Sequence, residues 1–210
     1  MTLPDHWNAT YAARAEVDLT WFEDVPEVSL HHVRRYLPQG GAMIDVGGGA
    51  SRLVDHVLQD RLGAVTVLDL SAEALAVTRD RLGALAVDVT FDVADVRAWT
   101  PDRAYDLWHD RAVFHFLTEP EDQRRYLETL AESLRPGGVA IIATFDLTGP
   151  ERCSRLPVQR YSPATLADRV ESLMPGLLIP LTAMHHAHVT PNGNTQDFQF
   201  SIFQKKETLS

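Results

Sequence analysis

The sequence predicts a doubly wound α/β fold: a seven-stranded, mostly parallel sheet closed by an antiparallel C-terminal hairpin. Three observations lead to this class. Short apolar runs alternate with longer helical patterns from Ala42 onward, and a glycine-rich turn follows the first run. Between the last two runs lie only Thr190 to Asn194 and a few polar residues. That is too short for a crossover helix, so these two strands pair as a hairpin.

Five strands are expected before the hairpin, at residues 42–46, 65–68, 87–91, 105–109 and 139–144. The run at 139–144 is apolar on both faces, which is typical of a strand at the centre of a parallel sheet. The hairpin strands are expected at 184–189 and 198–203, with the last strand antiparallel to the others.

Helical patterns separate these strands, at residues 51–62, 72–82, 118–135 and 163–174. Ser71 is expected to cap the second helix, and Thr118 with Glu121 to form a capping box for the third. The third helix is expected to end before Pro136-Gly137-Gly138, and Ser162-Pro163 opens the fourth.

Residues 1–38 stand outside this alternation, and residues 39–210 are expected to form the core domain. The N-terminal segment carries Trp7, Tyr11, Trp21 and an amphipathic stretch from Pro26 to Leu37. Two interpretations are open for this helical segment. It covers one side of the sheet, or it forms a lid over a ligand pocket, since tryptophan serves both as core filler and as pocket lining.

Composition and charge exclude several classes of protein. The 210 residues are 45% hydrophobic and 23% charged, which is typical of one globular domain. The net charge of -10 argues against nucleic-acid and anionic-membrane partners, which require clustered Lys and Arg. A single cysteine, Cys153, excludes an internal disulfide framework. Residues 1–5 show no signal-peptide pattern, so a cytoplasmic location is expected; the oligomeric state stays open, and a monomer is compatible with the sequence.

A glycine turn with acidic partners is the main chemical signal. Residues 47–49 are glycines that follow the first strand, where glycine permits a tight turn and a close approach of the backbone to a ligand. Asp69 ends the second strand, where a carboxylate can accept both hydroxyls of a ribose. Asp95 follows the third strand and can bond an adenine amino group.

Two nucleotide-binding patterns share this layout, and neither is complete. The dinucleotide pattern G-x-G-x-x-G requires glycine at position 52, which is Arg52, and the pattern G-x-G-x-G requires glycine at position 51, which is Ser51. Asp45 favours the second pattern, G-x-G-x-G, because it stands where it reaches a cationic ammonium group and would repel the pyrophosphate of a dinucleotide. The terminal hairpin also favours the second pattern.

On these residues the chain resembles the class I S-adenosylmethionine-dependent methyltransferases. The resemblance covers about residues 38–205 and rests on IDVGGGAS at 44–51, VLDLS at 67–71, ADV at 94–96 and LRPGG at 134–138. It implies a Rossmann-like methyltransferase fold, with S-adenosyl-L-methionine as cofactor and S-adenosyl-L-homocysteine as product. The cofactor-binding residues that it implies are Asp45, Gly47, Gly48, Gly49, Ser51, Arg52, Asp69, Leu70, Asp95, Val96, His109 and Asp110. Asp45 and the glycines would hold the methionine part, Asp69 the ribose, and Asp95 with Val96 the adenine.

A finer resemblance concerns the segment after the fourth strand. Trp108 to Ala112, followed by Arg125-Tyr126, is similar to the corresponding region of thiopurine and thiol methyltransferases. That similarity implies that Arg111 lies near the acceptor. The N-terminal aromatic residues are also similar to those of small protein-lysine methyltransferases, although that group usually carries lysine at the place of Arg111.

Residues after the fourth strand are expected to face the transferred methyl group, because doubly wound sheets bind ligands beyond the carboxyl ends of their strands. The expected catalytic residues are Asp110, Arg111 and His115. If the acceptor arrives protonated, Asp110, His109 or His115 is the expected base. A structural interpretation stands beside each: His115 as a core histidine, and Asp110 with Arg111 as an ion pair.

The expected substrate pocket is formed by Trp7, Tyr11, Trp21, Arg111 and Cys153. No metal site is expected. His186 and His188 share a strand face, but no carboxylate or cysteine completes a ligand set nearby in the sequence.

These patterns together predict methyl transfer to a small-molecule acceptor, with a thiol or similar soft nucleophile as one candidate. The alternative acceptor is a protein lysine. The alternatives from other classes are an NAD(P)-dependent oxidoreductase, against which Arg52 counts, and a cofactor-binding module without turnover.

Overall fold

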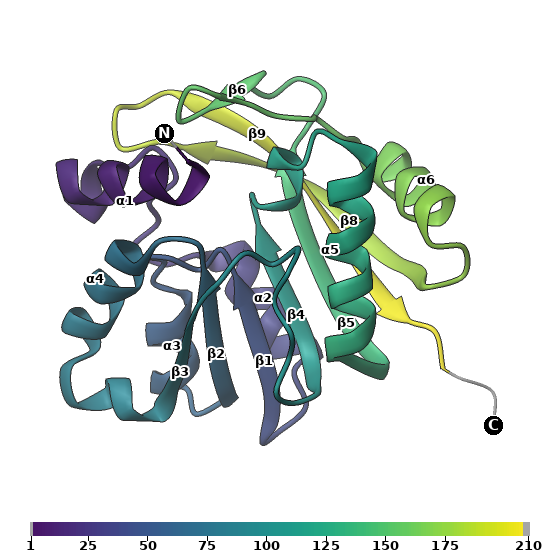
Figure 1. Ribbon diagram of the computed structural model, residues 1–210, viewed down its shortest axis with the longest axis horizontal. Coiled ribbons are helices and arrows are strands. Elements are labelled where there is room, and N and C mark those ends of the chain that lie inside the picture. The colour runs from purple at the N-terminus through teal and green to yellow at the C-terminus, as the bar shows by residue number, and fades with distance from the viewer. Residues whose placement is uncertain (1, 208–210) are drawn as a thin grey trace.

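A seven-stranded sheet forms the centre of the structure, a computed structural model that describes residues 2–207 (Figure 1). The strand order is β3-β2-β1-β4-β5-β9-β8. Neighbours from β3 to β5 are parallel, whereas β9 is antiparallel to both β5 and β8. The strands are β1 Gly41–Val46, β2 Gly63–Asp69, β3 Val89–Val93, β4 Tyr105–Arg111, β5 Leu134–Phe145, β8 Leu178–Val189 and β9 Thr195–Lys205. The predicted fold class, including the antiparallel hairpin, is confirmed.

Helices cover both faces of the sheet and its carboxyl edge (Figure 1). Their bounds are α1 Leu3–Ala13, α2 Glu27–Tyr36, α3 Leu53–Gln59, α4 Ala72–Leu82, α5 Pro120–Ser133 and α6 Pro163–Leu173, with 3-10 turns at Glu16–Asp18, Gly83–Asp88 and Phe114–Phe116. The predicted helix at 72–82 agrees with α4, and Ser71 caps it by accepting a hydrogen bond from the Ala74 amide. Met1, the first residue of the expected N-terminal segment, lies outside the described residues.

Two apolar cores flank the sheet, because successive side chains of a strand point to opposite faces. Met43 of β1 and Leu107 of β4 belong to the core under α2, α3 and α4. Ile44 and Trp108, one position further on, belong to the core under α5 and α6. Each such buried side chain stabilises the fold by about 1.5–3 kcal/mol relative to an exposed one. This alternation also decides to which face each residue at the strand ends points.

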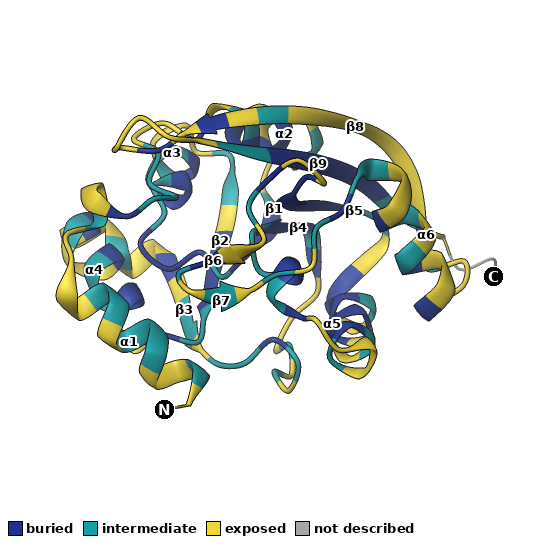
Figure 2. Cartoon of the chain, turned by 90° about the horizontal axis from the view of Figure 1, so that it is seen from above, coloured by how far each residue is buried: buried dark blue, intermediate teal, exposed yellow. Residues whose placement is uncertain are grey.

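The hairpin forms one margin of the sheet, and its outer strand β8 is far longer than the expected 184–189. Figure 2 shows β8 exposed along most of its length, whereas β9, β5, β4 and β1 are buried. The first part of β8 mixes Ile179, Pro180 and Leu181, all exposed, without the alternation of a half-buried strand. β8 is an edge strand that pairs with β9 alone. Its exposed side chains need no alternation of apolar and polar residues, so the sequence pattern does not mark this part of the strand.

The start of α5 corrects one sequence expectation. The helix is capped at Glu119 with no side-chain hydrogen bond, so the capping box of Thr118 and Glu121 does not form. Thr118 stands one residue too early, although Pro120 does occupy the first turn. Pro136 and the two glycines after it lie inside β5 and not in a loop; the register with β4 shifts there, between Tyr105 and Leu107.

Two further differences concern the ends of elements. The expected helix at 51–62 is shorter, because Asp60 caps α3 and Arg61 adopts a positive φ of 53°. The loop after β5 contains a small two-stranded sheet, β6 Arg152–Cys153 and β7 Leu156–Pro157, that no sequence pattern predicted. Within residues 2–207, no helix is long and apolar enough to span a membrane.

His32 on α2 is a buried histidine whose two ring nitrogens have no hydrogen-bond partner among the described residues. Its ring stacks on Tyr36 and lies against Phe200. Burial, helped by the charges of His31, His109 and Arg35, lowers the pKa of His32 to about 4. The unfolded chain, with an ordinary histidine pKa of 6.5, therefore binds more protons than the folded chain between pH 6.5 and 4.

We therefore expect the native protein to lose stability relative to the His32→Phe variant as the pH falls below 6.5. The loss is about 1.4 kcal/mol per pH unit, or about 2 kcal/mol by pH 5. Urea unfolding of both proteins from pH 7 to 5 measures it, with Glu27→Gln, at an exposed position of the same helix, as control. An unchanged difference between the native protein and His32→Phe across this range would contradict the prediction.

Candidate active site

The carboxyl ends of β1, β2, β3 and β4 open into a cavity that α1 covers (Figure 1). This strand-end cleft is lined by Gly47, Asp69 and Asp95 from the sheet edge and by Trp7 and Tyr11 from α1. Beyond Gly47 it adjoins a second hollow, lined by residues that include Asp45, Gly48, His109 and Arg111. The structure therefore brings acidic residues from three successive strand ends to one edge.

The turn after β1 requires glycine for steric reasons. Gly47 and Gly49 adopt positive φ angles of 66° and 44°. A methyl group on Gly47 would lie 2.1 Å from a carbon of the Val113 side chain, and one on Gly48 would lie 2.7 Å from Asp45 Oδ2. The turn thus leaves a bare backbone surface beside a carboxylate.

Asp45 is buried and only half satisfied. His109 Nδ1 donates to Asp45 Oδ1 at 2.7 Å, and His109 Nε2 lies 2.9 Å from the Ser29 hydroxyl of α2. Asp45 Oδ2 is buried and has no hydrogen-bond partner among the described residues. Because an unpaired buried carboxylate oxygen is costly, this atom indicates a cationic ligand at Gly48.

Asp69 stands at the end of β2 with its side chain against the same glycine turn. A methyl group on Gly49 would lie 3.0 Å from Asp69 Oδ2 and 2.8 Å from the Tyr11 hydroxyl, so both side chains meet there. Ser71 N donates to Asp69 Oδ1 at 2.8 Å. Burial, with the charge of Asp45, raises the pKa of Asp69 to about 7, while backbone amides at Ser71, Gly49 and Leu70 oppose the rise.

The third strand end provides the far wall of the strand-end cleft. Leu70 and Val96 line it together with Asp95. The Asp95 carboxylate is held by the Arg97 guanidinium, which also reaches Asp122 at 2.8 Å. The second hollow and the strand-end cleft together therefore pass from a polar end at Asp45 to a more apolar end at Leu70 and Val96.

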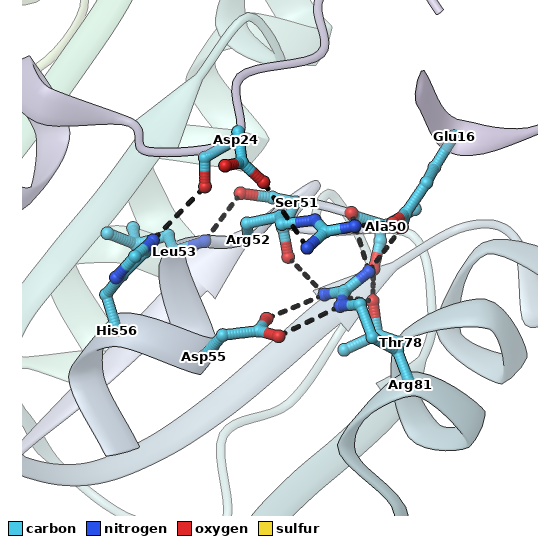
Figure 3. A network of polar contacts seen from close by, with 11 residues as sticks. Glu16, Asp24, Ala50, Ser51, Arg52, Leu53, Asp55, His56, Thr78 and Arg81 are labelled. Carbon is cyan, nitrogen blue, oxygen red and sulfur yellow. Dashed lines mark hydrogen bonds and ion pairs between the residues drawn. The ribbon is translucent and has the colours of Figure 1, made fainter. Parts of the chain in front are cut away.

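Arg52 and Ser51 have partners other than those expected (Figure 3). Arg52 donates to Glu16 of the N-terminal segment and lies 3.4 Å from Asp24. Arg81 of α4 also donates to Glu16 and to the carbonyl oxygens of Ala50 and Ser51. Arg52 thus holds the N-terminal segment against the glycine turn, and Ser51 and Arg52 also line the hollow beside Asp45, so their role in cofactor binding stays a prediction.

Asp110 does not line the strand-end cleft. Its carboxylate accepts hydrogen bonds from the amides of Val113 and Phe114 and from the Tyr126 hydroxyl, at 2.7, 3.0 and 2.6 Å. Burial raises the pKa of Asp110 to about 6 despite these donors. The carboxylate is therefore not placed to act as a base, and it holds the turn after β4 against α5; a contact of the Asp110 backbone with the cofactor stays a prediction.

His115 is likewise a core residue. Its Nδ1 accepts from the Phe145 amide at 3.3 Å, and its ring packs on Phe116 and Phe145. Burial and the charge of Arg111 lower the pKa of His115 to about 3, so the ring is neutral at physiological pH. With its acceptor nitrogen occupied and no exposed surface, His115 is not placed to serve as the base.

Arg111 faces a small aromatic cavity beside the strand-end cleft. This aromatic cavity is lined by Trp7, Trp21, Arg111, Ala112, Phe116, Phe145, Cys153, Gln196 and Phe198. It unites four of the five residues expected for the substrate pocket; Tyr11 lines the cleft instead. Arg111 donates to the Trp21 carbonyl and to Glu23, both at 3.1 Å, and lies over the Phe198 ring. Burial raises the pKa of Cys153 to about 12, so it stays an uncharged thiol.

Sequence analysis missed several residues of this region. Ser29, Glu23 and Phe198 come from elements remote from the glycine turn, and no local motif marks them. The amphipathic pattern of α2 pointed to its buried face, where Ser29 lies, but not to the contact with His109. No metal site is expected from the sequence, because no carboxylate or cysteine stands near His186 and His188 in the chain. That reason fails in the folded protein, where Glu23 lies beside both histidines.

Comparisons with known proteins agree with this geometry. Residues 43–138 match a family model described as a methyltransferase domain. A structure from work on disulfide-to-thioacetal conversion in echinomycin biosynthesis has 22% identity and a TM-score of 0.76, covering 100% of this chain and 95% of that one.

Two further solved structures hold S-adenosylhomocysteine. One is the Burkholderia thailandensis 1,6-didemethyltoxoflavin-N1-methyltransferase, also with 1,6-didemethyltoxoflavin bound, at 18% identity, 99% and 92% coverage and a TM-score of 0.68. The other is the N-methyltransferase NodS of Bradyrhizobium japonicum, at 14% identity, 97% and 100% coverage and a TM-score of 0.70. No curated protein matches the sequence closely enough to count as a relative. These matches give no support to the finer resemblance to thiopurine and thiol methyltransferases.

Proposed function

We propose that this S-adenosylmethionine-dependent methyltransferase transfers the methyl group to a small-molecule acceptor bound in the aromatic cavity. The observation that carries the proposal is the enclosure of that cavity. Trp7 and Trp21 of the N-terminal segment line it together with Phe116 and Phe198, and Trp7 packs edge-to-face on both Trp21 and Phe116. The cavity therefore suits a small flat or soft molecule better than a polypeptide. The toxoflavin N1-methyltransferase, which also acts on a small molecule, has the same fold.

The residues of the strand-end cleft fit the cofactor. The unpaired oxygen of Asp45 suits its ammonium group, and the glycine turn leaves space for the methionine part. Asp69 suits the ribose hydroxyls, and the wall at Asp95 and Val96 suits the adenine. His109 and Ser29 act as positioning residues, because they hold the other oxygen of Asp45.

When bound, the cofactor supplies a methyl group on a positively charged sulfur, which is already a good leaving group. The protein therefore needs mainly to align the acceptor and to exclude water. The aromatic rings perform both tasks: they shape the cavity and keep it dry. Arg111 anchors the Trp21 wall through the backbone carbonyl of that residue.

The lining of the aromatic cavity includes neither a carboxylate nor a histidine, and Cys153 is an uncharged thiol. The acceptor therefore arrives as a competent nucleophile and loses no proton to a residue of this cavity. The Arg111 guanidinium favours an anionic nucleophile beside it, which supports a thiolate or a related soft nucleophile as the acceptor.

A comparison of acceptor fractions tests this proposal. Radiolabelled S-adenosylmethionine is incubated with the protein and a whole lysate, and label is counted in the protein and small-molecule fractions. We expect the label in the small-molecule fraction. Arg111→Met should reduce this label by about tenfold or more, because the variant loses both the contact that holds Trp21 and the positive charge beside the acceptor. Label confined to protein bands would instead support the protein-lysine alternative.

Cofactor binding has its own prediction. Asp69→Asn should weaken S-adenosylhomocysteine binding about ten- to hundredfold, because hydrogen bonds to a charged carboxylate are lost. The pKa of Asp69 is about 7, so the free protein binds a proton there below pH 7, and a carboxylate that accepts from the ribose must release it. The affinity should therefore fall as the pH drops from 8 to 6, by at most about tenfold per unit.

Isothermal titration at several pH values measures both effects. Asp88→Asn, at an exposed position, is the control and should bind like the native protein. In Asp69→Asn the weakened binding should lose its dependence on pH in this range. Equal affinity of Asp69→Asn and the native protein would refute the assignment.

We also propose that the part of the N-terminal segment before α2, residues 2–26, forms a lid over the strand-end cleft, whereas α2 itself packs in the apolar core. Trp7 and Tyr11 of α1 line this cleft, yet α1 has no fully buried residue. Polar contacts hold the helix at both sides: Asn8 accepts from the Ser71 hydroxyl at 2.8 Å, and His6 lies 3.3 Å from the Ser154 hydroxyl. A helix held by polar contacts over a ligand cleft can open without exposing a large apolar surface.

Glu16→Gln tests the lid, because Glu16 pairs with both Arg52 and Arg81 (Figure 3). Loss of these partly buried ion pairs should speed S-adenosylhomocysteine dissociation about two- to fivefold and raise amide exchange in α1. Glu27→Gln, an exposed change in the first turn of α2, is the matched control. Unchanged dissociation and unchanged exchange in Glu16→Gln would contradict the lid.

A further inference from the structure

A cluster of three metal-ligating side chains lies outside the strand-end cleft. Glu23, from the connection before α2, approaches His186 and His188 of β8, and one ligand atom of each lies within 4.8 Å of the others. His188 Nδ1 is 3.1 Å from Glu23 Oε1, and His186 Nε2 is 3.7 Å from the same oxygen. The two histidines share a strand face because they are two positions apart.

The hydrogen bonds of His188 decide which of its nitrogens faces Glu23 as an acceptor. His188 Nε2 lies 2.9 Å from the Thr20 carbonyl oxygen, which can only accept, so Nε2 carries the hydrogen. In the neutral ring, Nδ1 then presents a lone pair to a carboxylate oxygen. Two acceptors at 3.1 Å are stable only with a positive charge between them, either a proton on Nδ1 or a metal ion.

The groups around the three side chains hydrogen-bond them in the way that residues around a bound metal hydrogen-bond its ligands. Ligating histidines generally donate their second ring nitrogen to a backbone carbonyl, as His188 does to Thr20, and ligating carboxylates are themselves hydrogen-bonded. Arg111 donates to Glu23 at 3.1 Å, on the same Oε1 atom that the two histidines approach, so a bound ion would share this oxygen with the guanidinium. Ligand atoms of a tetrahedral zinc site lie about 3.4 Å apart for bonds of about 2.1 Å, and the distances of 3.1 and 3.7 Å fall on either side of this value.

We propose that Glu23, His186 and His188 bind a divalent transition-metal ion, Zn²⁺ in the first place, through two imidazole nitrogens and one carboxylate. These three residues line a surface groove between the N-terminal segment and β8, so the fourth ligand position is open to water. The ion would join the N-terminal segment to the hairpin, and it would fix the carboxylate that holds Arg111. The site takes no part in the methyl transfer itself.

Metal binding by the untagged, chelator-treated protein tests the proposal. We expect one equivalent of Zn²⁺ by isothermal titration and elemental analysis, and Co²⁺ should give the intense visible absorption of a tetrahedral site with nitrogen and oxygen ligands. His186→Ala, at a half-exposed position, should weaken Zn²⁺ binding at least tenfold, and Glu23→Gln should do the same.

The matched control is His185→Ala. His185 is the neighbour of His186 on β8, but its ring contacts Asp146, so this variant should bind Zn²⁺ like the native protein. Far-ultraviolet circular dichroism and urea unfolding of each metal-free variant show that the variant is folded, and these measurements do not depend on the cofactor site. The proposal is overturned if the native protein binds neither ion stoichiometrically, as expected for a simple His188–Glu23 ion pair, or if His185→Ala loses as much affinity as His186→Ala.

Discussion

The buried contact of Asp45 with His109 is the interaction on which the rest of the site depends. The two residues are register partners on neighbouring parallel strands and point to the same face of the sheet. His109 satisfies one oxygen of Asp45, and Ser29 of α2 holds the far side of the ring, so a strand, its neighbour and a helix are joined around one negative charge. The other oxygen is unpaired and buried beside a glycine turn. Burying a carboxylate in this way is unfavourable unless a cation completes it, and this requirement is why the fold suits a positively charged cofactor.

The part of the N-terminal segment before α2 is tied to the core by charged groups, whereas α2 itself packs in the apolar core through Leu30 and Val33. Arg111 holds the part before α2 through Trp21 and Glu23, while Arg52 and Arg81 hold it through Glu16. All residues of these polar contacts except Arg81 also form walls of the aromatic cavity or of the hollow beside Asp45. The shape of the aromatic cavity therefore depends on the position of the segment, because Trp7 and Trp21 line this cavity.

The corrected assignments share one cause, which is the direction of side chains at the strand ends. His109 and Asp110 are adjacent in β4, so they point to opposite faces. His109 faces Asp45, whereas Asp110 faces the core under α5 and accepts three hydrogen bonds there. Their positions in the chain placed both residues near the cleft. Alternation along the strand then directs His109 toward Asp45 and Asp110 toward the turn after β4. Arg52 is a similar case, because its long side chain reaches the N-terminal segment.

Sequence alone determined the fold class, the glycine turn, the acidic residue at the end of β2, and four of the nine residues that line the aromatic cavity. These features depend on periodicity, on loop length and on short motifs, all of which are local in the chain. The tertiary structure alone decided which side chains meet: Ser29 with His109, Glu16 with two arginines, and Glu23 with His188, which stands 165 residues away in the chain. Contacts of this kind arise when separate elements pack on the sheet, and no spacing within one segment records the face that each element presents.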